Sequence, residues 1–225
     1  MMKLNLKYIA ASALTALALA STATADDASE RYVAENANAV LHTLNDPALD
    51  AESRTETFAS YMDQFTDLDA VSNFVIGRYA RTFTETELTE YRAAFRDYAL
   101  AVYESELDRY RGESVEVTGS YDRTPRDSIV NTRIPREDGQ AMDVRWRVLN
   151  RDGQYQVVDV ALNIEGNLLW LAIEQRAQFL ALLDRTNGSA DALIAKIRDM
   201  TSDLESSREV DSAFDALDTA ETASN

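Results

Sequence analysis

The stretch from Tyr155 to Phe179 constrains the fold more than any other part of the sequence. Residues 157–162 are apolar on both faces apart from one aspartate, as expected for a strand in the middle of a sheet. After a break that ends at Gly166, apolar residues recur at helical spacing from Leu169 onward. The sequence therefore predicts a buried strand followed directly by a helix that packs on the same sheet. The space between these two layers is either a core or a pocket.

The first 25 residues have the composition of a cleaved signal peptide. Lys3 and Lys7 precede an apolar run over residues 8–20, and a small-x-small cleavage motif follows at residues 23–25. This run is too short for a comfortable transmembrane helix, which needs about 20 apolar residues. We therefore expect a mature chain that starts near Asp26 and is exported to the periplasm, with a buried N-terminal helix as the alternative.

The chain is acidic and contains no cysteine. It holds 22 Lys and Arg against 39 Asp and Glu, a formal charge of −17. Removing the signal peptide takes away two bases, which leaves 20 against 39, or −19. Such a field repels nucleic-acid phosphates and anionic lipid surfaces, so we expect no nucleic-acid partner. The alternative is a merely well-solubilised or salt-adapted surface. Without cysteine, neither a disulfide framework nor a lipid anchor at the cleavage site is available.

Four helices are predicted ahead of any strand, because apolar residues recur at helical spacing in each segment. The turn around Pro47 ends the first helix. Thr84 and Glu87 form a capping box at the start of the fourth and longest helix. The predicted helices span about residues 26–46, 52–65, 68–79 and 84–110.

The apolar period then changes to two, which predicts strands. Four strands are expected around residues 115–117, 130–134, 142–148 and 157–162, with turns at Asp138-Gly139 and Asp152-Gly153. Two helices follow, the second capped by Ser189. This order predicts an α+β domain over residues 26–200, with a four-stranded antiparallel sheet and helices packed on one face. Residues 201–225 carry many acids without an apolar period, and we expect a disordered or weakly helical tail.

The sequence offers little for catalysis. His42 is the only histidine, and there is no Gly-rich phosphate loop among seven glycines. Zinc sites and His-based triads are therefore nearly excluded. Acid pairs one helical turn apart, such as Glu104 and Asp108, are expected by chance in so acidic a chain. We predict that the protein is not an enzyme and that it needs no metal or cofactor.

Aromatic residues are the more informative feature. Five tyrosines fall on the third and fourth predicted helices, and Trp146 points to the apolar side of its strand. A plain hydrophobic core with tyrosine hydroxyls at its rim explains this pattern, and so does a ligand cavity. The residue types alone leave both interpretations open.

Several segments, taken in order, resemble one known family. Ile76–Arg81 (IGRYAR) is similar to a Leu-Gly-Arg-Tyr-Trp-Arg block, and Val157–Val160 is similar to the family's last strand. Residues 110–113 match the junction before the first strand, and residues 175–179 and 191–197 match the two closing helices. The resemblance covers most of residues 30–200. It is to the MlaC-type periplasmic phospholipid-binding proteins, also called toluene-tolerance proteins.

The resemblance implies a monomeric carrier that encloses the acyl chains of one phospholipid in an apolar cavity between sheet and helices. It also implies two partners, an outer-membrane lipoprotein complex and an inner-membrane ABC transporter with an MCE-domain subunit. Alternatives are a carrier of another apolar cargo, such as a hopanoid-type or aromatic compound, and a non-carrier interaction module with a closed core. The candidate lipid-binding residues lie where the apolar stripes converge: Tyr79, Val102, Tyr103, Val144, Trp146, Val148, Val160, Leu169 and Phe179.

Overall fold

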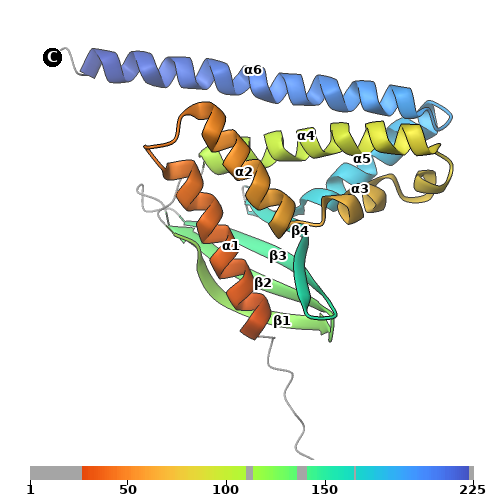
Figure 1. Cartoon of the computed structure of the whole chain (residues 1–225), viewed down its shortest axis with the longest axis horizontal. Coiled ribbons are helices and arrows are strands. Elements are labelled where there is room, and N and C mark those ends of the chain that lie inside the picture. Colours follow the sequence, from red (N-terminus) through yellow and green to blue (C-terminus); the bar gives the residue numbers. More distant parts are fainter. Residues whose placement is uncertain (1–26, 110–113, 136–140, 165, 223–225) are drawn as a thin grey trace, which may run out of the picture.

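The computed structural model describes residues 27–109, 114–135, 141–164 and 166–222. Within these residues the chain has six α-helices and one antiparallel sheet, which confirms the predicted α+β class (Figure 1). The predicted signal peptide and the predicted turn at Asp138-Gly139 lie outside the described residues. The helices before the sheet are α1 (Asp27–Asn45), α2 (Ala51–Phe65), α3 (Leu68–Ile76), the short 3₁₀ helix η1 (Gly77–Arg81) and α4 (Glu85–Arg109).

The sheet is a simple antiparallel meander. Its strands are β1 (Glu116–Thr124), β2 (Asp127–Pro135), β3 (Ala141–Arg151), β4 (Gln154–Ile164) and β5 (Asn167–Trp170), and they lie side by side in chain order. The predicted turn at Asp152-Gly153 is confirmed, because both residues have positive φ angles, 56° and 91°. A two-residue hairpin loop of type I′ needs positive φ at both positions, and Asp-Gly supplies them at little cost.

The prediction of four strands was wrong by one. Residues 167–170 form β5, which pairs with the end of β4, and helix α5 (Leu171–Arg185) begins only after it. Gly166 has a φ of 86°, a conformation that glycine adopts without strain, just before this return. The strand has only four residues, which is too short to show a period of two in the sequence. Leu169 was therefore assigned to the helix although it lies in the strand.

Two predicted caps are confirmed. The backbone N–H of Thr84 donates to the Glu87 carboxylate (2.7 Å), and the N–H of Glu87 donates to the Thr84 hydroxyl (3.2 Å), which is the reciprocal capping box of α4. The hydroxyl of Ser189 accepts a hydrogen bond from the N–H of Ala192 at the start of α6 (Ala190–Thr222).

Helix α6 lies alongside α4 and continues through the acidic segment to Thr222 (Figure 1). Whether residues 201–225 form a tail separate from the domain stays a prediction. No helix in the described part of the chain is both long enough and apolar enough to cross a membrane.

The buried side chains form two cores. In the first, α1 and α2 pack against one face of the sheet, and in the second, α3, α4, α5 and α6 pack together. Tyr103, near the end of α4, packs against both cores. Tyr103 therefore lies at the boundary between the two cores, on the side of the first core that α4 covers.

Candidate functional site

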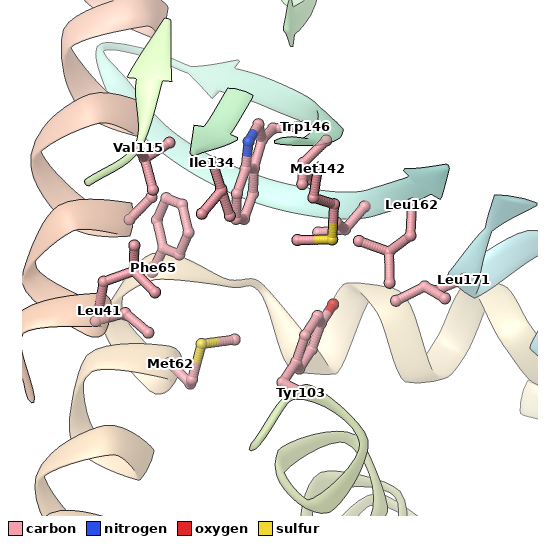
Figure 2. Close-up of a pocket in the computed structure, with 14 residues that line it drawn as sticks. Leu41, Met62, Phe65, Tyr103, Val115, Ile134, Met142, Trp146, Leu162 and Leu171 are labelled. Atoms are coloured by element: carbon pink, nitrogen blue, oxygen red, sulfur yellow. The ribbon is translucent and has the colours of Figure 1, made fainter. Parts of the chain in front are cut away.

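A pocket lies inside the first core, between the sheet and helices α1, α2 and α4 (Figure 2). It contains about 590 Å³ of space that protein atoms do not fill, part of it open to solvent. In Figure 2, Trp146, Met142 and Leu162 extend from the sheet toward Met62 and Tyr103 on the helices. The lining residues are Ala37, Val40, Leu41, Met62, Phe65, Tyr103, Val115, Ile134, Met142, Val144, Trp146, Val160, Leu162 and Leu171.

The wall of this pocket offers almost no polar chemistry. None of the described residues that line it is charged. The indole N–H of Trp146 donates to the Thr132 hydroxyl (2.8 Å), so the polar edge of the ring is already satisfied. The Trp146 ring also packs against Phe65, with ring centroids 5.5 Å apart. The pocket therefore presents carbon and sulfur atoms to whatever enters it, and hydrocarbon is the chemistry that it suits.

Tyr103 contributes the hydroxyl group in the lining. Burial raises the pKa of the Tyr103 phenol well above its ordinary value, and the negative charge of Asp159 raises it further. The phenol is therefore neutral at every physiological pH. It adds a polar tip to an otherwise apolar wall and no charge.

One buried carboxylate lies where the wall joins helix α5. Asp159 on β4 is only 5% exposed, and one of its oxygens accepts hydrogen bonds from the N–H groups of Val160 (2.9 Å) and Ala172 (3.0 Å). Burial raises the pKa of the Asp159 carboxyl to about 6, although these two donors and Arg147 act in the opposite direction. The N-cap residue of α5, Trp170, provides no side-chain acceptor. Asp159 therefore caps the helix that begins with the lining residue Leu171.

Four of the nine predicted site residues line the pocket: Tyr103, Val144, Trp146 and Val160. Val148 is buried in the same core outside the lining. Tyr79 and Phe179 belong instead to the second core, where Phe179 packs edge-on against Phe95.

Val102 on α4 and Leu169 on β5 are half-buried and do not line the pocket. Whether any of the nine predicted residues contacts a ligand stays a prediction.

Sequence reasoning missed the helices that form the opposite wall. The stripes on α1 and α2 were visible, but their spacing does not say which of six helices faces the sheet. The missed lining residues are Ala37, Val40, Leu41, Met62, Phe65, Val115, Ile134, Met142, Leu162 and Leu171.

The described residues show no cluster of three or more His, Cys, Asp or Glu side chains that could hold a metal ion. That the protein is not an enzyme stays a prediction.

Comparison with known proteins agrees with this geometry. The chain is similar in structure to the phospholipid-binding protein from Ralstonia solanacearum, which was solved in complex with a phospholipid. The TM-score is 0.67 with 19% sequence identity, over 79% of this chain and 98% of that one, so the likeness is one of fold. No curated protein matches the sequence. Residues 34–199 match the family described as MlaC protein, which is well over half of the chain. The chain belongs to the MlaC protein family.

Proposed function

We propose that this protein is a periplasmic phospholipid carrier that holds acyl chains in the pocket between the sheet and helices α1, α2 and α4. The observation that carries the proposal is the apolar, uncharged wall that the described residues give this pocket. Family membership and the phospholipid bound to the Ralstonia protein support it. The head group would lie toward solvent, because the described lining residues include no cation and offer a phosphate little beyond the Tyr103 hydroxyl.

The energetics of such a carrier favour exchange. Each methylene removed from water contributes about 0.8 kcal/mol, so two acyl chains are held with some tens of kcal/mol before any costs. A membrane buries the same methylenes equally well. Movement of lipid between pocket and membrane is therefore close to neutral, and neither hydrolysis nor a catalytic group is needed.

The direction of transfer would come from partners. We propose that the carrier moves lipid between an outer-membrane lipoprotein complex and an inner-membrane ABC transporter with an MCE-domain subunit. The acidic surface, with 39 acids against 22 bases, disfavours docking on a bare anionic membrane. We expect the carrier to act as a monomer and to need these partners for exchange with anionic membranes, whereas zwitterionic vesicles, which do not repel it, can exchange lipid with it directly.

The test is to fill the pocket from within. Ala37 is buried in α1 and lines the pocket, so Ala37→Phe places a ring in the space that acyl chains would occupy. The matched control is Ala181→Phe, on an exposed position of α5. Delipidated protein is mixed with vesicles that contain a fluorescent phospholipid, and the lipid recovered with the protein is measured. We expect the wild type and Ala181→Phe to load and Ala37→Phe to remain empty while melting near the wild-type temperature.

The other outcomes separate the alternatives. If no variant takes up phospholipid but the wild type takes up a hopanoid-type or aromatic compound, the cargo is different. If Ala37→Phe loses several kcal/mol of stability and the wild type binds nothing, the core is closed. Overpacking a filled core costs typically 1–3 kcal/mol, whereas filling a real space does not.

A further inference from the structure

The buried carboxylate of Asp159 has no ion-pair partner among the described residues. Arg147 on β3, the cation whose charge lowers the pKa of Asp159, donates from Nε and Nη2 to the two carboxylate oxygens of Asp127 (3.0 and 2.9 Å). Asp127 also accepts from Arg123 (3.1 Å). Arg147 thus forms its ion pair with Asp127, and it acts on Asp159 only through the weaker electrostatic attraction of its charge. Two neutral N–H donors must compensate for the loss of water around Asp159, and a charge buried in this way is costly.

The segment that buries Asp159 is also part of the pocket wall. Ala172, which donates to Asp159, is the second residue of α5, and Leu171 before it lines the pocket. Strand β5, which leads into this turn, has four residues, lies at the edge of the sheet and pairs with β4 alone. This short edge strand and the first helical turn form one unit, residues 167–173, which we call the wall segment.

The body of α5 is anchored to α3 and α4, whereas the wall segment is held by its pairing with β4 and by Ala172, which is buried in the second core. The Tyr98 hydroxyl donates to Gln175 (2.8 Å), and the Arg176 guanidinium donates to the backbone carbonyl of Phe74. Phe179 is buried in the second core. The wall segment is therefore bounded by Gly166, at a φ of 86°, on one side and by anchored helix on the other. Gly166 and the first turn of α5 are the two places where the chain would bend if the wall segment moved outward.

We propose that the charge on Asp159 loosens the wall segment, so that the pocket opens at Leu171 for lipid exchange when Asp159 is ionised and closes when it is protonated. The proposal rests on the proposed function, because it names the gate of the same pocket. Its direction follows from linkage: a state in which water reaches the carboxylate favours the charged form, and the buried state favours the neutral form.

The expected size of the effect follows from the two pKa values. Burial raises the pKa of Asp159 from 3.8 to about 6 in the closed wall, and we take 3.8 for a water-exposed carboxyl. Between about pH 5 and pH 7, the ratio of open to closed wall then rises roughly tenfold.

Other charged groups around Asp159 do not give this response. Arg147 and Asp127 form a bidentate pair, and burial keeps the Tyr103 phenol neutral throughout this range. Asp67, which packs near β4, is paired with Arg151. Among the described residues, the remaining acid near the start of α5 is Glu174, which is exposed. Strand β5 carries no titratable side chain.

The test measures the rate at which a fluorescent phospholipid leaves the loaded protein for zwitterionic acceptor vesicles, across pH 4.5 to 8. For the wild type we expect a roughly tenfold rise between pH 5 and pH 7, with a midpoint near pH 6. Asp159→Asn keeps the shape and an acceptor oxygen without the charge, and it should be slow at every pH. Glu174→Gln and His42→Gln are the controls, since they remove an exposed acid from the same turn and the only histidine. Both should keep the wild-type profile.

A second measurement does not depend on lipid. Because the chain has no cysteine, Ile173→Cys on α5 and Tyr121→Cys on β1, both exposed, can carry a pair of spin labels. We expect the distance distribution between the labels to broaden above about pH 6 and to stay narrow at every pH when Asp159→Asn is added.

Several results would overturn the proposal. They are a flat wild-type rate, a rate that falls as the pH rises, a pH dependence retained by Asp159→Asn or lost in His42→Gln, or a label distance that ignores pH. A label distance that changes with pH in a protein that binds no phospholipid would instead refute the proposed function and leave the gate standing. If Asp159→Asn fails to fold, the proposal can still be tested without it. The remaining measurements are the wild-type pH profile, the His42→Gln control and the label distances in the protein with Asp159 intact.

Discussion

Replacing Trp146 with alanine should weaken lipid retention more than an equally severe change elsewhere in the core. Trp146 is buried, contacts Phe65 and donates a hydrogen bond to Thr132. Truncations of this kind cost about 3–5 kcal/mol of folding free energy. If roughly a third of the ring area, about 60 Å², faces the ligand, its loss removes about 1.5 kcal/mol of binding and speeds release roughly tenfold.

The matched variant is Phe179→Ala. Phe179 is also buried, at 2% exposure against 9% for Trp146, but it lies in the second core and does not line the pocket. Urea unfolding should show a similar loss of 3–5 kcal/mol for both variants. Release of a fluorescent phospholipid to acceptor vesicles should accelerate for Trp146→Ala alone.

The pair of variants also defines what would refute this reasoning. Equal acceleration in both would mean that lipid retention follows general stability, so that Trp146 acts only as a core residue. No acceleration in either, with both destabilised, would place the ligand away from the pocket described here.

Three further predictions follow from charge and burial. Deleting the residues after Met200 should change the melting temperature by less than about 2 °C, because side chains 202, 203 and 205–207 are exposed; a large drop would show that this part of α6 stabilises the body. Binding to the transporter or lipoprotein partner should weaken as salt rises, since the acidic surface requires basic partner surfaces; affinity that is flat with salt, or strong binding to naked anionic vesicles, would rule out electrostatic docking. The Asp159→Asn protein should unfold at higher urea than the wild type at pH 7, by up to about 3 kcal/mol, because the pKa of Asp159 is raised from 3.8 to about 6 in the folded state. This stabilisation should fade as the pH falls through 6 and vanish below about 4, and a difference that grows in acid would contradict the assignment.

Much of the fold could be predicted because its signals are local. The capping box at Thr84, the Asp152-Gly153 turn and the alternation in β3 each specify backbone geometry within a few residues. The strand β5 escaped prediction because its identity comes from pairing with β4, and four residues carry no period. Pairing with β4 therefore determines that these four residues form a strand, and their local sequence preference does not.

The pocket could be predicted only in part, for a similar reason. The sheet side is encoded by alternation, and Val144, Trp146 and Val160 were identified from it. The helix side depends on which helices cover that face, and periodicity gives each helix an apolar stripe without naming its neighbour. Phe179 and Tyr79 carry the same kind of stripe as Met62 but bury it against other helices.

The role of Asp159 lies furthest from sequence reasoning. In the sequence it is a single acid inside an apolar strand. Its role depends on the hydrogen bond from the N–H of Ala172, thirteen residues away, and on the ion pair that Arg147 forms with Asp127. These relations exist only once the sheet and α5 have packed.

Native mass spectrometry of the protein purified from cells tests the central claim most directly. We expect a protein that carries a mass increment equal to one diacyl phospholipid, which collisional activation removes, and an Ala37→Phe variant that carries none. A wild-type protein that is isolated at its bare mass, or with an adduct that is not a phospholipid, would contradict the claim that this chain is a phospholipid carrier.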